Sequence, residues 1–217
     1  MSFLSVFLDL DGTITDSMPG ITNSVSYALA QYGIQAKPES LQKFVGPPLR
    51  ESFQKYFPET FNENTVDDVI AQFKIRYAEK GVHELAVYPG MAELIADLHA
   101  AGKQIVLATS KGENFARQIL DETGLARYFA FISGADYPTN RLSKAEVLRH
   151  ALKNLPDIHV ANSIMVGDRE HDIIGAHAVN MRCAAVLFGY GSRAELEEAG
   201  ADYIMESVSD LRNRLLA

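Results

Sequence analysis

Side chains that can do chemistry recur in this chain where apolar stretches end or a helical pattern begins. These residues are Asp9, Asp11, Thr109, Ser110, Lys144, Asp168 and Asp172. Each has an ordinary explanation by itself, because Asp-Gly pairs form turns, Thr and Ser cap helices, and most lysines are solvated. In an open sheet, however, the carboxyl ends of parallel strands meet at one edge. Taken together, the set favours a functional site.

The four aspartates of this set cannot all stay ionised at one edge without compensation. Two carboxylates ~4 Å apart repel by ~4 kcal/mol at an effective dielectric of about 20. A hard divalent cation relieves this repulsion, and a few carboxylates completed by substrate oxygens are typical of Mg²⁺. Lys144 adds an ammonium group and Thr109 adds a hydroxyl donor. A metal ion, an ammonium and several donors around one space describe a phosphate-binding site.

The two leading carboxylates, Asp9 and Asp11, can divide the work of phosphoryl transfer. A carboxylate that is ionised at neutral pH attacks phosphorus without a base and forms an aspartyl-phosphate. A second carboxylate, two residues further along an extended segment, points the same way. If its pKa is raised, it can protonate the leaving alcohol and later take a proton from water. Gly12 allows the chain to turn sharply after them.

Apolar stretches of strand length alternate with helical patterns over most of the chain. The expected strands are 4–10, 104–109, 128–133, 163–167, 183–188 and 202–205. Most are apolar throughout, which is typical of parallel strands covered by helices on both faces. The expected helices are 91–101, 113–123 and 143–154. Ser143 and Glu146 have the spacing of a capping box, and the alternation predicts an α/β fold with a mainly parallel sheet.

One region breaks this alternation. Residues 16–84 contain several prolines and glycines and no convincing buried strand. Their helical patterns cover 21–32, 49–56 and 65–80. We interpret the region as an all-helical insertion, with re-entry into the α/β core at Tyr88-Pro89-Gly90. The expected domains are a core formed by 1–15 and 85–217, and a helical cap formed by 16–84.

Two features of the cap bear on substrate binding. Arg50 follows a stiff Gly46-Pro47-Pro48 turn and is the cap residue expected to contact a carboxylate or phosphate group, although an exposed helix arginine is the ordinary alternative. The cap also carries four aromatic residues in or near its second helical pattern: Phe44, Phe53, Tyr56 and Phe57. They can stack a nucleobase, but such residues more often pack a small helical core.

The composition narrows the classes of partner. The chain has 217 residues, a net charge of −8 and one cysteine, so it forms no intramolecular disulfide. The charge argues against a nucleic-acid polymer, because proteins that bind one carry a basic face. No apolar run approaches the roughly 20 residues of a membrane span, and the N-terminal run is too short for a signal peptide. We expect a cytoplasmic monomer or homodimer whose partner is a small phosphorylated metabolite.

In order and approximate spacing, the motifs resemble those of the haloacid dehalogenase-like superfamily, and of its phosphatases in particular. The segment from Asp9 to Thr13 (DLDGT) resembles the first motif and Thr109 the second, while Lys144 resembles the third and Gly167-Asp168 with Asp172 the fourth. The resemblance covers nearly the whole chain. It implies a Rossmann-like parallel sheet flanked by helices, with an inserted helical cap.

The resemblance also implies a role for each matching position. Asp9 would be the nucleophile and a Mg²⁺ ligand, and Asp11 the general acid and base, with its backbone carbonyl on the metal. Thr109 and Lys144 would hold the phosphoryl oxygens. Asp168 would bind Mg²⁺, and Asp172 would support the ion directly or through water. Gly12, Ser110 and Arg50 complete the expected phosphate- and substrate-binding set, and Lys111 either donates to the phosphate or begins the next helix.

The wider pattern is similar to phosphoglycolate phosphatase-like and 5′-nucleotidase-like members, and the segment GDREHDIIGA favours the second branch. One departure is that Lys144 follows Arg141-Leu142-Ser143, whereas Lys-Pro is common at this point in phosphoglycolate phosphatases. The expected function is Mg²⁺-dependent hydrolysis of small phosphate monoesters. Two alternatives stay open: a phosphosugar mutase that uses the same aspartyl-phosphate, and a non-enzymatic phospho-receiver module. A dehalogenase would leave Asp11 and the acidic fourth motif without use.

Overall fold

The apolar stretches form one six-stranded parallel sheet in the order β5-β4-β1-β6-β7-β8. The structure is a computed structural model and describes residues 3–136 and 138–217. The strands are β1 (Ser5–Leu8), β4 (Gln104–Gly112), β5 (Phe131–Ala135), β6 (Ser163–Gly167), β7 (Arg182–Val186) and β8 (Tyr203–Met205). This sheet belongs to the first of two compact units, the core unit, which consists of Met1–Thr15 and Val87–Ala217.

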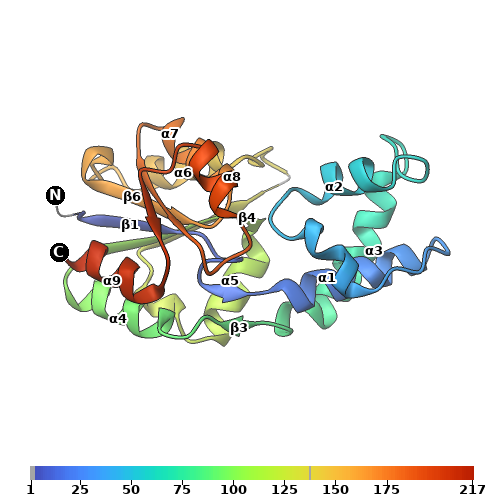
Figure 1. The fold of residues 1–217 in the computed structure, drawn as a ribbon, viewed down its shortest axis with the longest axis horizontal. Coiled ribbons are helices and arrows are strands. Elements are labelled where there is room, and N and C mark those ends of the chain that lie inside the picture. The colour runs from blue at the N-terminus through green and yellow to red at the C-terminus, as the bar shows by residue number, and fades with distance from the viewer. Residues whose placement is uncertain (1–2, 137) are drawn as a thin grey trace. The chain divides into compact units, whose positions relative to one another are not determined.

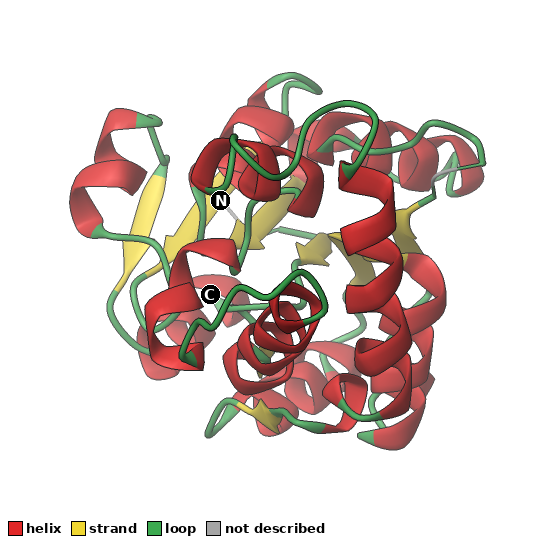
Figure 2. Ribbon diagram, turned by 90° about the vertical axis from the view of Figure 1, so that its right-hand side faces the viewer, coloured by secondary structure: helices red, strands yellow, loops and turns green. Residues whose placement is uncertain are grey.

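Helices cover both faces of this sheet, as continuous apolar strands require. They are α4 (Met91–Ala100), α5 (Glu113–Glu122), α6 (Lys144–Asn154), α7 (Glu170–His177), α8 (Arg193–Glu198) and α9 (Val208–Leu216), with the 3₁₀ helices η3 (Ala126–Tyr128) and η4 (Val160–Asn162). Figure 1 shows α6 and α7 on one side of the sheet and α4 and α9 on the other. In Figure 2 the strands, in yellow, run between these helical layers.

The strand register lines up one buried face of the sheet. Phe7 lies opposite both Val106 and Met165, and Met165 lies opposite Cys183. These four side chains are buried in one cluster with residues of α6 and α7, such as Val147. The cluster fixes the central strands relative to the helix that begins at Lys144, and so it fixes the edge of the sheet where the polar residues stand.

The second compact unit, the inserted unit, comprises Asp16–Ala86 and is helical. Its elements are α1 (Met18–Ala30), η1 (Pro38–Phe44), α2 (Leu49–Tyr56), α3 (Val66–Glu79) and η2 (Gly81–His83). Phe44 and Phe53 are buried with their ring centroids 5.0 Å apart, and Phe53 lies 5.4 Å from Phe61. These aromatic rings therefore form the unit's own small core. A bidentate ion pair at 2.8 Å joins Arg76 in α3 to Glu84.

The structure confirms the expected α/β fold and corrects several boundaries. The second long strand continues to Gly112 instead of ending at Thr109, because its register with β5 shifts between Ala108 and Gly112. The next strand begins at Phe131, since residues 126–128 form a 3₁₀ turn. Sequence analysis also missed α7, α8, α9 and the short paired strands β2 (Thr15–Asp16) and β3 (Ala86–Val87).

No helix in the described part of the chain is long and apolar enough to cross a membrane.

Candidate active site

The carboxyl ends of three neighbouring strands bring the polar residues of the core unit together. Leu8 at the end of β1 lies opposite Leu107 in β4 and Val166 in β6. Asp9 follows directly, and its N–H continues the ladder by donating to the Val166 carbonyl at 2.9 Å. Asp168 follows the end of β6 in the same way. The sheet topology thus places side chains that are far apart in sequence at one edge.

Three buried carboxylates lie together at this edge, and two of them bind one buried ammonium group. The carboxylate oxygens of Asp9, Asp168 and Asp172 lie within 4.8 Å of one another. The Nζ of Lys144 lies 2.9 Å from Asp9 Oδ1 and 2.7 Å from Asp172 Oδ1, and it donates to the Ala108 carbonyl at 2.9 Å. The side chain of Lys144 is only 2% exposed. Three acidic groups and one basic group leave this cluster short of positive charge.

The protonation of the cluster reflects this shortage. Burial raises the pKa of Asp9 to about 6, against the opposing effect of Lys144. Burial, together with the charges of Asp172 and Asp9, holds the pKa of Asp168 well above its ordinary value. Burial alone would lower the pKa of Lys144, but the carboxylates of Asp172 and Asp9 outweigh it and raise that pKa. Strongly shifted carboxyl groups in one cluster are typical of functional sites.

The acidic cluster has the properties of a site for a divalent metal ion. Among the described residues, Asp168 Oδ1 is buried and accepts no hydrogen bond. Lys144 is the basic group that lies against both Asp9 and Asp172. A bound cation would supply the missing charge and reverse the conditions that now favour protonated carboxyl groups. The donor set of buried carboxylate oxygens fits such an ion.

Asp172 shapes the turn that carries Asp168. Its Oδ2 accepts hydrogen bonds from the backbone N–H groups of Asp168 at 3.1 Å and Arg169 at 3.0 Å. A Cβ on Gly167 would overlap the Asp172 carboxylate, so the strand must end in glycine for this turn to close. The Arg169 side chain is held in turn by Glu195 at 2.7 Å. One oxygen of Asp172 therefore organises the loop, while the other faces Lys144.

The loop after β7 also supports Asp168, and sequence analysis missed it. The backbone N–H of Tyr190 donates to Asp168 Oδ2 at 2.8 Å. A Cβ on Gly189 would overlap the Asp168 side chain, and one on Gly12 would overlap its carboxylate. Gly12 also has a φ of 80°, which a side chain disfavours. The Gly-Tyr-Gly sequence directly after an apolar run was the available signal.

Asp11 stands apart from the three-aspartate cluster and pairs with a second lysine. The Nζ of Lys111 lies 2.6 and 2.9 Å from the two carboxylate oxygens of Asp11. Lys111 lies in β4 and does not begin the next helix, which starts at Glu113. Thr109, also in β4, is buried, and its hydroxyl lowers the pKa of Asp9 through a hydrogen bond. Ser110 stands between these two residues in the same strand.

Arg50 belongs to the inserted unit. It lies in α2, where its guanidinium forms an ion pair with Asp67 and stands 3.8 Å from Glu63. The side chain is 39% exposed. Its contact with a substrate stays a prediction.

The comparisons with known proteins agree on the family. The family model described as haloacid dehalogenase-like hydrolase matches residues 6–186. The chain belongs to this family, and it is a phosphoric monoester hydrolase. It resembles the crystal structure of a predicted phosphatase from Clostridium acetobutylicum with a TM-score of 0.94 and 41% identity, over 100% of this chain and 99% of the other.

Two curated relatives of this chain carry names for different activities. A 5′-nucleotidase of Pseudomonas aeruginosa is 33% identical over 99% of this chain and 96% of its own length. The tyrosine-protein kinase PtkA of Mycobacterium tuberculosis is 34% identical over 97% of this chain and 72% of its own length. One relative is named a nucleotidase and the other a protein kinase, so the substrate of this chain is a matter for the proposed function.

Proposed function

We propose that this protein hydrolyses small phosphate monoesters through an aspartyl-phosphate formed on Asp9. The observation that carries the proposal is the buried group of Asp9, Asp168 and Asp172 around the ammonium of Lys144. A carboxylate held beside a fixed ammonium group and a buried hydroxyl can attack a phosphorus atom. The ammonium and the hydroxyl then stabilise the negative charge on the phosphoryl oxygens. The hydrolase family and the shared core fold support this reading.

Each step then has a residue in this chain. An Asp9 oxygen attacks the phosphorus atom, the bond from phosphorus to the ester oxygen breaks, and Asp11 gives a proton to the leaving alcohol. Water next attacks the same phosphorus atom while Asp11 takes its proton. The bond from phosphorus to Asp9 breaks, and inorganic phosphate leaves. Thr109 and Lys144 hold phosphoryl oxygens in both steps.

The proposal includes a Mg²⁺ ion held by Asp9 and Asp168, with Asp172 in support and the backbone carbonyl of Asp11 as a further ligand. When bound, the ion neutralises charge on the phosphoryl oxygens and on the carboxylates. The raised pKa values of Asp9 and Asp168 support a cation at this place, because one ammonium group does not offset the burial of three neighbouring carboxyl groups. Lys144 is already engaged by two of the three acids.

Nucleoside monophosphates and phosphoglycolate are the proposed substrate classes. The relative named 5′-nucleotidase aligns over nearly the full length of both chains and supports the first. The overall motif pattern supports the second. Arg50 is proposed as the residue of the inserted unit that contacts the part of the substrate remote from the reacting phosphate.

A phosphate-release assay over a panel of monoesters tests the proposal. The panel contains nucleoside monophosphates, phosphoglycolate and sugar phosphates, each measured with Mg²⁺ and after treatment with EDTA. We expect release of inorganic phosphate that EDTA abolishes and added Mg²⁺ restores. Asp202→Asn is the matched control, because Asp202 lies in the core unit directly before β8 and outside the acidic cluster.

Three results would contradict the proposal. Turnover that is unaffected by EDTA would exclude the metal. Conversion of a sugar phosphate without net phosphate release would indicate a mutase. Transfer of phosphate from ATP to a tyrosine, without hydrolysis of any monoester, would indicate the activity named for the mycobacterial relative.

A further inference from the structure

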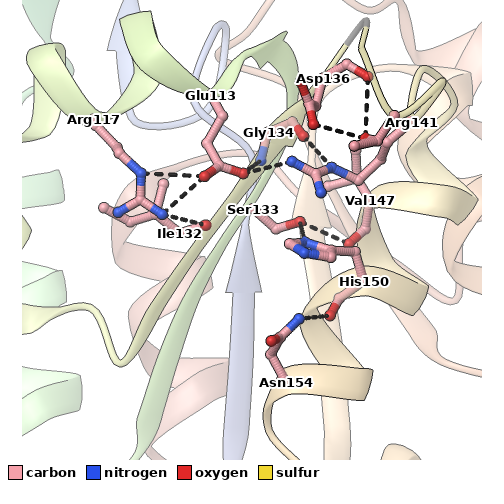
Figure 3. A network of polar contacts seen from close by, with 11 residues as sticks. Glu113, Arg117, Ile132, Ser133, Gly134, Asp136, Arg141, Val147, His150 and Asn154 are labelled. Atoms are coloured by element: carbon pink, nitrogen blue, oxygen red, sulfur yellow. Dashed lines mark hydrogen bonds and ion pairs between the residues drawn. The ribbon is translucent and has the colours of Figure 1, made fainter.

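The carboxylate of Glu113, the first residue of α5, joins three parts of the core unit outside the acidic cluster. Its Oε2 accepts hydrogen bonds from the Arg141 guanidinium at 2.7 Å and from the Gly134 backbone N–H at 3.2 Å. Its Oε1 accepts from Arg117 at 2.9 Å. Figure 3 shows the two arginines approaching this carboxylate from opposite sides. The proposed function uses none of these residues.

Arg141 is fixed by both its side chain and its backbone. Its Nε donates to the Gly134 carbonyl at 2.7 Å while another nitrogen of the guanidinium binds Glu113. Its backbone N–H and carbonyl form an isolated bridge with Asp136, at 3.0 and 2.8 Å. The side chain is only 12% exposed. A planar guanidinium engaged in this way sets the position of the backbone that carries it.

These contacts stand next to both phosphate-binding elements. Arg141 comes three residues before Lys144, the first residue of α6. Glu113 follows directly on β4, the strand that contains Thr109. A Cβ on Gly134 would lie 2.5 Å from the Glu113 Cα, so the close approach of β5 to the start of α5 requires a glycine here. The network thus bridges the end of β4 and the start of α6.

A second contact anchors the middle of α6 to β5. The buried hydroxyl of Ser133, in β5, donates to the Val147 carbonyl at 2.9 Å and lies 3.1 Å from His150 Nδ1. Figure 3 places this contact below the arginine network, where Ser133 meets Val147 and His150 of α6. The middle of α6 is therefore anchored independently of Arg141, and Arg141 acts on the segment that leads into Lys144.

We propose that Glu113 and Arg141 are positioning residues that fix the spacing between the Thr109 hydroxyl and the Lys144 ammonium. This inference rests on the proposed function, in which both groups hold phosphoryl oxygens. A displacement of about 1 Å at such groups can lower the rate about 100-fold, because the transition state no longer fits. The proposal also gives a physical reason for an arginine in the Arg141-Leu142-Ser143 sequence before Lys144.

Arg117 provides a matched control within the same network. It binds the same carboxylate as Arg141, but from one turn further along α5, and its other partner is the Ile132 carbonyl at 3.2 Å. Its side chain is 49% exposed. Removing Arg117 therefore takes one cation from Glu113 without releasing the segment that leads to Lys144.

The experiment compares Arg141→Gln, Glu113→Gln, Arg117→Gln and the Glu113→Gln/Arg141→Gln double variant in the full chain. With the best monoester of the panel and Mg²⁺, we expect kcat of Arg141→Gln to fall about 10- to 100-fold, with KM within about threefold. The double variant should be no more than about twofold slower than the slower single variant, because the two residues act as one unit. Arg117→Gln should keep kcat within about twofold.

Hydrogen exchange of the peptides that contain Thr109 and Lys144 gives a readout independent of turnover. We expect faster exchange in both peptides of Arg141→Gln and unchanged exchange at Lys144 in Arg117→Gln. An active wild type with equal kcat in the two arginine variants would overturn the inference alone. A wild type that hydrolyses no monoester would overturn the proposed function. The exchange data would then test the positioning inference by themselves. Unchanged exchange in Arg141→Gln would then overturn the inference, and faster exchange in both peptides would support it.

Discussion

The parallel strands of the core sheet have an aspartate at their amino ends (the amino edge) and another at their carboxyl ends (the carboxyl edge). The two aspartates differ in how many hydrogen-bond partners they have. Asp202 precedes β8 at the amino edge, where its Oδ2 accepts from the Cys183 N–H at 2.9 Å and lies 3.1 Å from His177 Nε2. Asp168 follows β6 at the carboxyl edge, where one oxygen accepts from Tyr190 and the other accepts no hydrogen bond within the described residues.

Their pKa values move in opposite directions for this reason. Burial alone would raise the pKa of Asp202, but hydrogen bonds from Cys183 and His177 hold it below its ordinary value. Burial and two neighbouring carboxylates keep the pKa of Asp168 well above its own. Ionised Asp202 therefore stabilises the fold, whereas ionised Asp168 destabilises it. Buried charge without a full set of partners therefore distinguishes the site from the scaffold.

The largest expected effect separates the two edges by activity. Asp9→Asn keeps the shape of the side chain but removes the attacking carboxylate, so we expect phosphate release to fall at least about 1000-fold. Asp202→Asn, at the other edge, should stay within about twofold of the wild type. Initial rates under saturating Mg²⁺ measure both, with circular dichroism as the check on folding. Comparable losses in the two variants would remove the functional distinction between the edges.

The next effect concerns Lys144, the ammonium group that binds two carboxylates of the acidic cluster. Lys144→Met leaves three buried carboxylates without their ammonium, and we expect the free energy of unfolding to fall by about 3–5 kcal/mol in EDTA at pH 8. Arg193→Met is the control, because Arg193 pairs with Glu206 at the surface, where such pairs contribute about 0–1 kcal/mol. Urea denaturation measures both. Equal losses would show that the carboxyl groups are protonated and need no cation.

Asp168→Asn tests whether the buried charge of Asp168 lowers the stability of the folded state. Raised pKa values mean that the folded state binds more protons than the unfolded state, so stability falls as the pH rises through the folded pKa, about 6 for Asp9. In EDTA, the wild type should lose stability between pH 5 and pH 8. We expect the decline to be shallower in Asp168→Asn, and the variant to be more stable at pH 8 by at least about 1 kcal/mol. Added Mg²⁺ should stabilise only the wild type appreciably, and a variant less stable than the wild type would refute this reading.

The smallest effect has the opposite sign. The lowered pKa of Asp202 means that its contribution is present above its ordinary pKa of 3.8 and is lost as the pH falls through the folded value. We expect Asp202→Asn to lower the free energy of unfolding by about 0.5 kcal/mol at pH 6, because the pair with His177 is partly exposed. Denaturation at pH 6 and pH 3 measures it, and a stabilised variant at pH 6 would erase the contrast with Asp168.

Local patterns were sufficient to predict the strands that lead to Asp9 and Asp168 and the helix that begins at Lys144. Uninterrupted apolar runs identified β1 and β6, and both halves of the capping box between Ser143 and Glu146 are present at the start of α6. The order of the motifs then indicated that Asp9, Lys144 and Asp168 meet at one edge. These features depend on residues within a few positions of one another, or on the general rule for strand ends.

Features set by neighbours distant in sequence could not be predicted in this way. The extension of β4 to Gly112 depends on a register shift against β5, which no residue of β4 encodes alone. The role of Gly189 becomes visible only once β7 lies beside β6 and brings its loop onto Asp168. The pair of Lys111 with Asp11 joins residues 100 positions apart. Sequence analysis therefore described the residues of the acidic cluster better than the residues that support them.

The pairing of β2 with β3 has a consequence for how the chain folds. β1 must pair with β4 across a long separation, since Ser5 and Gln104 are 99 positions apart. The inserted unit enters and leaves the core at two strands that lie side by side. If that unit forms first, the loop left to close is roughly a quarter as long, which saves about 1 kcal/mol of closure entropy. An early inserted unit would thus speed the formation of the sheet's central strand pair.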